Sequence, residues 1–175
     1  IFQPLCQQQQ KTLQASSINC QLGVWADSKL LDRILTNLLS NALKYTPAGG
    51  KISIDVKAEA DKVQIIVSDT GIGISPKEQK KLFTSFFRAS NAISSGTPGI
   101  GLGLLQAKRF ATLLKGDIKV NSIVNQGSEF MLILNKAAVT ASAVPTTTPI
   151  TKDFTTTENT TLCDSDKDTL LIVED

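Results

Sequence analysis

Histidine is absent from the 175 residues of this sequence. The absence excludes Ser-His-Asp and Cys-His catalysis, histidine metal ligands and histidine general bases. Cysteine is scarce: Cys6, Cys20 and Cys163 are far apart, so neither a disulfide framework nor a zinc site is indicated. Any chemistry must therefore depend on Asp, Asn, Lys, Arg and backbone groups, and a reducing cytoplasm is the expected location.

Long apolar runs are also missing. No segment approaches the roughly eighteen apolar residues that a helix needs to cross a bilayer. The first ten residues lack the basic, apolar and small-residue order of a signal peptide. We therefore expect the chain as given to be soluble and cytoplasmic, whether or not a longer parent protein is anchored in a membrane.

Charge is distributed unevenly. Residues 1–135 contain fifteen Lys and Arg against nine Asp and Glu, whereas residues 136–175 contain three against seven. The basic surplus suits an anionic ligand such as a nucleotide. It is scattered, without a run of four basic residues, so we expect no binding of nucleic acid by this fragment.

The same boundary divides the chain into three predicted regions. Residues 1–135 form one folded domain with a single core. Residues 136–168 are rich in Thr, Ala, Pro and Ser, cannot bury enough apolar surface to fold, and are predicted to be a flexible linker. Residues 169–175 form a short apolar strand that ends in two carboxylates.

Periodicity predicts the elements of the folded domain. After the end of a helix near the N-terminus, strands are expected at residues 12–18, 23–26, 51–58, 62–68, 117–124 and 128–134. Helices are expected at residues 27–46, 75–87 and 101–114, with a loop at 89–100. This order predicts an α+β fold, a two-layer sandwich in which about three helices cover one face of a mixed sheet of about five strands.

Two helix starts carry particular residues. Asp27 can cap the first long helix. Ser75, Pro76 and Glu78 have the spacing of a capping box with proline at the first helical position, so the second helix is expected to continue to Phe86 or Phe87.

A polar stripe follows one side of the first long helix. Asn37, Asn41 and Lys44 fall on one side at about 100° per residue. Such a stripe next to an apolar face could be an ordinary solvated face or the wall of a polar site.

Two glycine-rich segments follow this helix in the sequence. Asp69-Thr-Gly-Ile-Gly follows a strand, where a carboxylate can accept a hydrogen bond from an exocyclic amine; a plain β-turn is the alternative. Residues 96–103 end at a helix N-terminus, which favours an anion such as phosphate; a flexible loop is the alternative. The spacing does not match the phosphate loop or the dinucleotide fingerprint.

The combination is more specific than its parts. Four motifs occur in order: Asn-Leu-Leu-Ser-Asn-Ala-Leu-Lys-Tyr-Thr at 37–46, Asp-Thr-Gly-Ile-Gly-Ile at 69–74, Leu-Phe-Thr-Ser-Phe-Phe-Arg at 82–88 and Gly-Ile-Gly-Leu-Gly-Leu at 99–104. Over about residues 2–135 the chain closely resembles the catalytic ATP-binding domain of sensor histidine kinases. That superfamily also includes gyrase, heat-shock protein 90 and the mismatch-repair ATPases.

The resemblance implies ATP and Mg²⁺ as cofactors and assigns roles to residues. Asp69 would read adenine, Asn41 would ligate Mg²⁺, Lys44 and Arg88 would contact phosphates, and Tyr45 would form a wall of the site. Further nucleotide contacts are implied at Asn37, Gly71, Gly73, Ile74, Thr97, Leu102 and Ser128. The resemblance also implies a lid at residues 89–99. Its hinge and floor would be formed by Gly99, Gly101 and Gly103, and Phe83 and Phe86 would anchor it to the core. Plain core packing is the alternative for both phenylalanines.

Asn37 separates the branches of this superfamily. The ATPase members have a glutamate at this position that activates water, and an amide cannot accept that proton. Hydrolysis is therefore not expected. In the kinases the nucleophile is a histidine on a separate helical dimerisation domain, which this histidine-free chain lacks, with Asn37, Lys44 and Arg88 as possible supporting residues.

The C-terminal segment has two interpretations. Leu170-Leu-Ile-Val-Glu-Asp175 resembles the opening strand of a receiver domain, which would make the parent a hybrid kinase of a phosphorelay. Alternatively, it is an exposed tail that pairs with a sheet edge of its own or, as we rather expect, a neighbouring chain, so the fragment would be a monomer or weakly paired. A nucleotide-binding or interaction module without phosphotransfer remains the alternative function.

Overall fold

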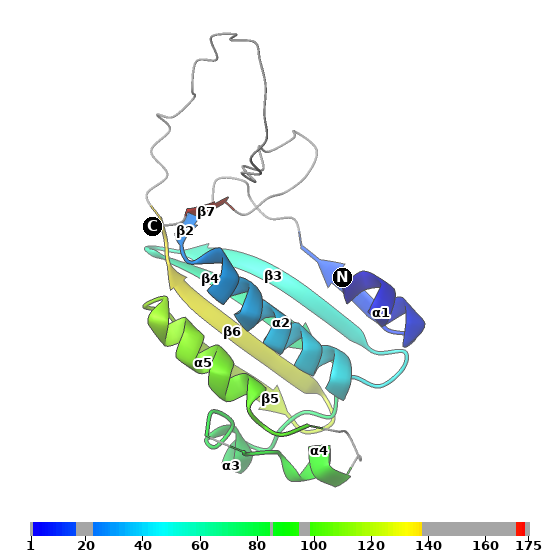
Figure 1. The fold of residues 1–175 in the computed structure, drawn as a ribbon. Helices are drawn as coiled ribbons and strands as arrows, with labels where there is room; N and C mark the ends of the chain where they lie inside the picture. Colours follow the sequence, from blue (N-terminus) through cyan, green and yellow to red (C-terminus); the bar gives the residue numbers. More distant parts are fainter. Residues whose placement is uncertain (1, 17–22, 85, 95–98, 138–170, 174–175) are drawn as a thin grey trace, which may run out of the picture.

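A five-stranded mixed sheet forms the centre of the computed structural model, which describes residues 2–16, 23–84, 86–94, 99–137 and 171–173. The strands are β1 (Thr12–Ala15), β3 (Lys51–Glu59), β4 (Lys62–Asp69), β5 (Asp117–Ile123) and β6 (Gly127–Asn135). Their order is β1-β3-β4-β6-β5; β1 and β3 are parallel, and the other neighbours are antiparallel (Figure 1). The predicted mixed sheet is confirmed.

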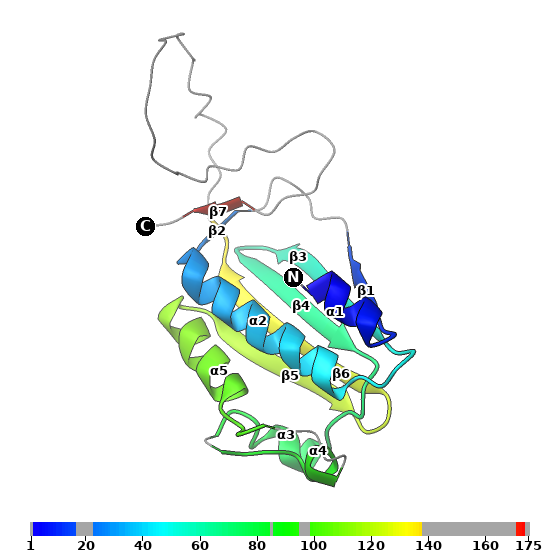
Figure 2. The same cartoon turned by 45° about the vertical axis from the view of Figure 1, so that its right-hand side comes forward.

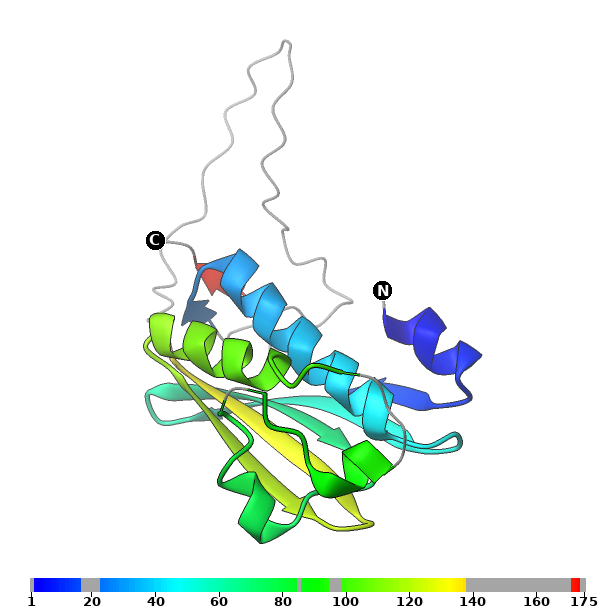
Figure 3. The same cartoon turned by 60° about the horizontal axis from the view of Figure 1, so that its bottom comes forward.

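Helices cover one face of this sheet. Figure 3 shows α2 (Ser28–Tyr45) and α5 (Gly103–Leu113) side by side in a layer above the strands. The short α1 (Phe2–Gln8) lies beside β1 at the edge of the sheet (Figure 1). The predicted two-layer sandwich is therefore confirmed, and the site is built where the two layers meet.

The core lies between the two layers. On β4, Val63, Ile65 and Val67 are each at most 1% exposed, and their two-residue spacing points them to one face of the sheet. On α2, Ile34 and Leu38 are fully buried one turn apart and face these valines and isoleucines across the layer. This apolar contact fixes the position of the helix on the sheet.

Local signals explain both ends of α2. The Asp27 carboxylate accepts a hydrogen bond from the backbone N–H of Leu30 at 3.0 Å, which is the predicted cap. At the other end, the Thr46 hydroxyl and N–H both donate to the Ala42 carbonyl, at 2.6 and 3.1 Å. The predicted limits of this helix are confirmed.

The second predicted helix is much shorter than expected. α3 contains only Pro76–Gln79, so the prediction that it continues to Phe86 or Phe87 is wrong. The Ser75 hydroxyl donates to the Glu78 carboxylate at 2.7 Å and makes no capping bond to the backbone. The other carboxylate oxygen of Glu78 accepts from the Ser90 N–H at 2.8 Å, so this side chain also links α3 to the start of α4.

The loop predicted at residues 89–100 contains a helix. α4 spans Ser90–Ser94, and Ala89 and Ala92 are 6% and 5% exposed, so the expectation of a loop is wrong at these residues. α3 and α4 lie together at one end of the sheet (Figure 2). α5 begins at Gly103 and not at the predicted Gly101, whose φ of +80° is not helical.

A second, two-stranded sheet involves the C-terminal segment. β2 (Gly23–Trp25) pairs in parallel with β7 (Leu171–Val173), and Val24 also bridges to Lys136. The predicted pairing of the tail is thus seen with β2 of its own chain and not with an edge of the five-stranded sheet. The predicted extension of the first strand beyond residue 16 and most of the predicted linker lie outside the described residues.

No helix in the described part of the chain is long and apolar enough to cross a membrane.

Candidate functional site

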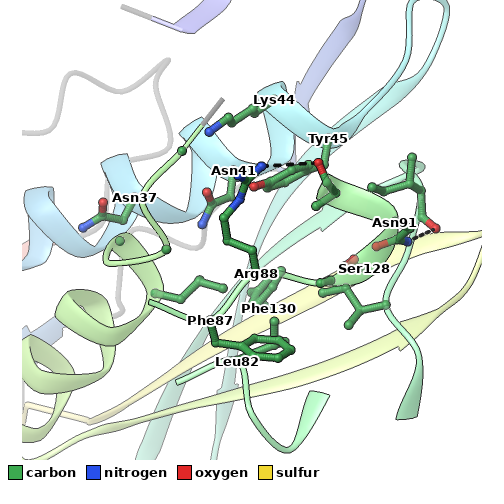
Figure 4. Close-up of a pocket in the computed structure, with 18 of the residues that line it drawn as sticks. Asn37, Asn41, Lys44, Tyr45, Leu82, Phe87, Arg88, Asn91, Ser128 and Phe130 are labelled. Carbon is green, nitrogen blue, oxygen red and sulfur yellow. Dashed lines mark hydrogen bonds between the residues drawn. The ribbon is translucent and has the colours of Figure 1, made fainter. Parts of the chain in front are cut away.

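A cavity of about 530 Å³ opens between α2, the start of α5 and the end of the sheet where α3 and α4 lie (Figure 4). Most of the residues predicted for the site line this cavity: Asn37, Asn41, Lys44, Tyr45, Asp69, Gly73, Ile74, Arg88, Gly99, Gly101, Leu102, Gly103 and Ser128. The fold thus brings together residues from all four motifs and Ser128, which are up to about ninety positions apart in the sequence.

Three of the predicted residues that the structure describes do not line the cavity. The Gly71 N–H instead donates to the Asp69 carboxylate at 2.8 Å. Phe83 packs against the core, with the Lys108 Nζ 5.0 Å from its ring centroid. The prediction that Phe86 anchors the lid is wrong, because its side chain is 69% exposed; its neighbour Phe87 lines the cavity. Thr97, which was also predicted, lies outside the described residues.

The polar stripe of α2 faces the glycine-rich segment. A Cβ atom added to Gly99 would lie 2.7 Å from the Lys44 Nζ, and one added to Gly103 would lie 3.1 Å from the Asn37 Oδ1. The Lys44 Nζ is the end of a flexible side chain and could move aside, so the short distance shows only that this lysine lies against the glycine-rich segment. The stripe forms a wall of a partly enclosed site, which favours the second of its two interpretations.

Asp69 lies at the end of β4, beside Ser128 of β6. Burial raises the pKa of its carboxyl from 3.8 to about 6, although hydrogen bonds from the N–H groups of Gly71 and Ser128 act in the opposite direction. A half-buried carboxylate with its pKa raised by burial, inside a cavity, is typical of a functional position. It can accept a hydrogen bond from a ligand.

A buried hydrogen-bond network supports the backbone next to Asp69. The Ser122 hydroxyl accepts from the Ile74 N–H at 2.8 Å, donates to the Gly127 carbonyl at 2.8 Å and lies 3.0 Å from the Ser128 hydroxyl. The Gln79 amide donates to the carbonyls of Ile74 and Ser122 at 2.9 and 2.8 Å. The floor of the cavity is therefore held by polar side chains from three elements.

The α4 side of the cavity is held by polar contacts as well. The Arg88 Nη2 donates to the Ala92 carbonyl at 3.4 Å, and Figure 4 shows its side chain reaching toward Asn41 and Tyr45. The Asn91 Nδ2 donates to the Gly73 carbonyl at 2.7 Å. These contacts fix α4 against the segment that follows Asp69.

Sequence reasoning missed several residues that line the cavity: Ile72, Leu82, Phe87, Ala89, Asn91, Ala92, Ile100, Leu104, Gln106 and Phe130. Alternation along β6 places Phe130 on the same face as Ser128, so that residue could have been found. Asn91 could not, because its partners lie eighteen and nineteen residues away in the chain.

The arrangement suits an anionic ligand with an aromatic base. Lys44 and Arg88 supply positive charge, and α5 directs its N-terminus at the cavity, where backbone N–H groups favour phosphate. In the described part of the chain no group of three His, Cys, Asp or Glu could hold a metal. A divalent cation would therefore have to be shared between the ligand and an oxygen donor such as the Asn41 amide, which fits Mg²⁺ bound mainly to phosphates.

Curated proteins are similar to this chain over about 113 residues. SenX3, a sensor-like histidine kinase of Mycobacterium tuberculosis, is 42% identical over 113 residues, 65% of this chain and 28% of SenX3. SaeS, a histidine protein kinase of Staphylococcus aureus, is 39% identical over 113 residues, 63% of this chain and 32% of SaeS. The chain thus spans about a third or less of the length of these curated relatives.

Solved structures share the fold. The mycobacterial sensor histidine kinase MprB has a TM-score of 0.65 at 25% identity and covers 77% of this chain and 90% of its own. Full-length ShkA in complex with AMPPNP has a TM-score of 0.69 at 26% identity and covers 80% of this chain and 28% of its own. The described fold is therefore that of the histidine kinase catalytic ATP-binding domain.

The family model described as "Histidine kinase-, DNA gyrase B-, and HSP90-like ATPase" matches residues 26–138, which is more than half of the chain. Those residues include all four motifs and the whole wall of the cavity. The chain therefore belongs to this family, and it is homologous to the catalytic domains of sensor histidine kinases.

Proposed function

We propose that this chain binds Mg-ATP and donates the γ-phosphate to a histidine on a separate dimerisation domain, as part of two-component signal transduction. One observation carries the proposal: a single cavity has a half-buried carboxylate at one end and a lysine, an arginine and a helix N-terminus at its walls. The adenine of ATP can donate a hydrogen bond to the carboxylate, and its triphosphate is an anion that suits the positively charged walls.

The base would lie against Asp69. The exocyclic amine of adenine donates hydrogen bonds, and the ionised carboxylate accepts them, whereas guanine presents a carbonyl at the same position. Ile74 and Tyr45 offer apolar or aromatic surface beside it, and Ser128 completes the floor. Adenine is therefore preferred over guanine because guanine would leave the half-buried carboxylate facing another acceptor.

The phosphates would lie toward Lys44, Arg88 and the backbone of the segment from Gly99 to Gly103. When bound, Mg²⁺ supplies positive charge to the β- and γ-phosphates. Asn41 would offer it an amide oxygen, and the remaining ligands would be phosphate oxygens and water.

The lack of a base for water distinguishes transfer from hydrolysis. An incoming imidazole nitrogen would form a bond to the γ-phosphorus while the bond to the bridging oxygen of ADP breaks, and ADP leaves with that electron pair. The Asn37 amide lines the cavity and cannot accept a proton from water. Transfer to a second domain is therefore favoured over a hydrolytic ATPase.

The test is transfer in trans. The chain is incubated with γ-labelled ATP and the separately produced helical domain that carries the phosphoacceptor histidine of the parent protein. Label should appear on that domain, with little phosphate released in its absence. Binding of ATP without any labelled acceptor would instead support a nucleotide-binding module without phosphotransfer. Asp69→Asn should remove most of the preference for ATP over GTP in calorimetry, and equal binding of both nucleotides to the unaltered chain would contradict the adenine assignment.

The remaining segments extend the proposal. We propose that residues 136–168 are a linker and that residues 169–175 begin a receiver domain, so that a response-regulator receiver is a second partner. Their composition and the apolar strand followed by Glu174 and Asp175 support this. The site is expected to face the cytoplasm, where ATP is available.

A further inference from the structure

Asn91 has an unusual position for a residue of a short helix. It lies in α4, lines the cavity and is directed at the backbone that follows Asp69 (Figure 4). Its Nδ2 donates to the carbonyls of Ile72 and Gly73, at 3.3 and 2.7 Å. Only the NH₂ end of an amide can donate, so these two carbonyls fix which end of the side chain is nitrogen and which is oxygen.

The other end of this amide is not used by the protein. The Asn91 Oδ1 is buried, and no group among the described residues donates a hydrogen bond to it. A buried carbonyl oxygen without a donor is costly, and such groups are normally satisfied by protein, water or ligand. Because Asn91 belongs to the wall of the cavity, a ligand in the cavity can supply the donor.

The chemistry of a nucleotide limits what that donor can be. The ionised phosphates of ATP only accept hydrogen bonds, so they cannot satisfy a carbonyl oxygen. The nucleoside carries donors in two places, the exocyclic amine of the base and the hydroxyls of the ribose. Asn91 is anchored on residues that follow Asp69 by three and four positions, which places it at the nucleoside end of the cavity.

We propose that Asn91 is a nucleotide-binding residue whose Oδ1 accepts a hydrogen bond from the nucleoside, while its Nδ2 holds α4 on the carbonyls of Ile72 and Gly73. The inference rests on the proposed binding of Mg-ATP. It adds a specificity contact from the α4 side of the cavity, opposite the α2 wall. Bound nucleoside thereby joins α4 to the segment next to Asp69 through one side chain.

The test compares nucleotides that each lack one donor. Calorimetry measures the affinities of ATP, 2′-deoxy-ATP, 3′-deoxy-ATP and N6,N6-dimethyl-ATP for the unaltered chain and for Asn91→Ala. Asn121→Ala is the matched control, because Asn121 is exposed on β5 and outside the cavity. If Asn91→Ala does not fold, Asn91→Ser replaces it.

The expected result is a coupling between one analogue and one residue. Asn91→Ala should weaken ATP about two- to tenfold, the range of one hydrogen bond between neutral groups. The analogue that lacks the contacted donor should already bind the unaltered chain more weakly by a similar factor and lose little more on Asn91→Ala. A deoxy analogue whose affinity is insensitive to Asn91→Ala identifies the ribose. A dimethyl analogue that is insensitive to Asn91→Ala identifies the amine, although its affinity for the unaltered chain is also reduced by loss of the Asp69 contact.

Two other results have different meanings. If Asn91→Ala weakens all four nucleotides by the same factor, Asn91 only holds α4 in place and the inference is overturned. An unchanged affinity for all four overturns it as well. If the unaltered chain binds none of them, the proposed function fails instead, so the two failures can be told apart.

Discussion

The two walls of the cavity are held by different forces. The α2 wall is an eighteen-residue helix with leucine and isoleucine side chains fully buried against the sheet. The opposite wall, called here the α3–α4 wall, is lined by Leu82 and by residues 87–89, 91 and 92, which include the start of the five-residue α4. It follows the four-residue α3, which buries no side chain and does not line the cavity. Hydrogen bonds that Gln79 and Asn91 donate and that the Glu78 carboxylate accepts hold it.

The two walls should therefore differ in how much they stabilise the domain and in how readily they respond to a ligand. Burying a leucine stabilises a fold by about 1.5–3 kcal/mol, and it is insensitive to the ligand. A single hydrogen bond contributes about 0.5–1.5 kcal/mol and can be exchanged for one to a ligand or water. The α2 wall should therefore set the stability of the domain, and the α3–α4 wall should respond to nucleotide and pH.

The largest expected effect is on the α2 wall. Leu38→Ala should lower the free energy of unfolding by about 3 kcal/mol, because Leu38 is fully buried and its truncation leaves a cavity in the core. Leu113→Ala is the control, since Leu113 is 67% exposed at the end of α5. Urea denaturation measures both. Equal losses would show that burial does not distinguish these positions.

Asp69 tests the floor between the two walls through pH. Its pKa is raised from 3.8 to about 6, so the folded state binds the proton more tightly than the unfolded state. Relative to Asp69→Asn, the unaltered chain should therefore lose about 2–3 kcal/mol of stability as pH rises from about 4 to about 6, and nothing more above that. Denaturation at several pH values measures the difference, and a parallel pH profile for both proteins would contradict the burial of this carboxyl.

Asn41 tests the part of the α2 wall that is proposed to face the phosphates and Mg²⁺. Asn41→Ala should weaken ATP binding about tenfold in Mg²⁺ and less than about twofold in EDTA, because only the metal-dependent part of the affinity is lost. Lys44→Ala should weaken binding in both conditions. Calorimetry with and without Mg²⁺ separates the two effects, and an equal loss in both solutions for Asn41→Ala would exclude it as the metal ligand.

The same contrast explains what could be predicted from the sequence. α2 follows from apolar spacing and from Asp27, both local signals, and its limits were predicted correctly. The four motifs are also local sequence signals, and they identify much of the cavity wall. α3 was predicted too long because Glu78 forms its second set of hydrogen bonds with Ser90, twelve residues away, which no local pattern indicates.

α4 and the position of Asn91, on the opposite wall, could not be predicted from the sequence. Residues 90–94 have the composition of a loop, and their helix depends on buried alanines and on carbonyls next to Asp69. The resemblance implied that Phe86 anchors a lid to the core, but a backbone φ of +58° accompanies its exposure, and Phe87 lines the cavity instead. Tertiary contacts, and not local preference, decide these positions.

The smallest expected effect concerns Glu78, which joins α3 to α4. Hydrogen bonds from the hydroxyl and N–H of Ser90, and then from Ser75, lower the pKa of its carboxyl from 4.5 to about 2. The contribution to stability is therefore present above pH 4.5 and is lost as pH falls through about 2.

At neutral pH, Glu78→Gln removes the charge and keeps one acceptor oxygen, so the link should weaken without disappearing. Hydrogen exchange at residues 90–94 should become a few-fold faster, while the melting temperature changes little, because the exchange reports local opening and the core is untouched. Glu59→Gln, an exposed glutamate on β3, is the matched control. If exchange in α4 is unchanged by Glu78→Gln and by Glu78→Ala, the polar link does not hold this wall, and the buried Ala89 and Ala92 must do so, as buried leucines do on the opposite side.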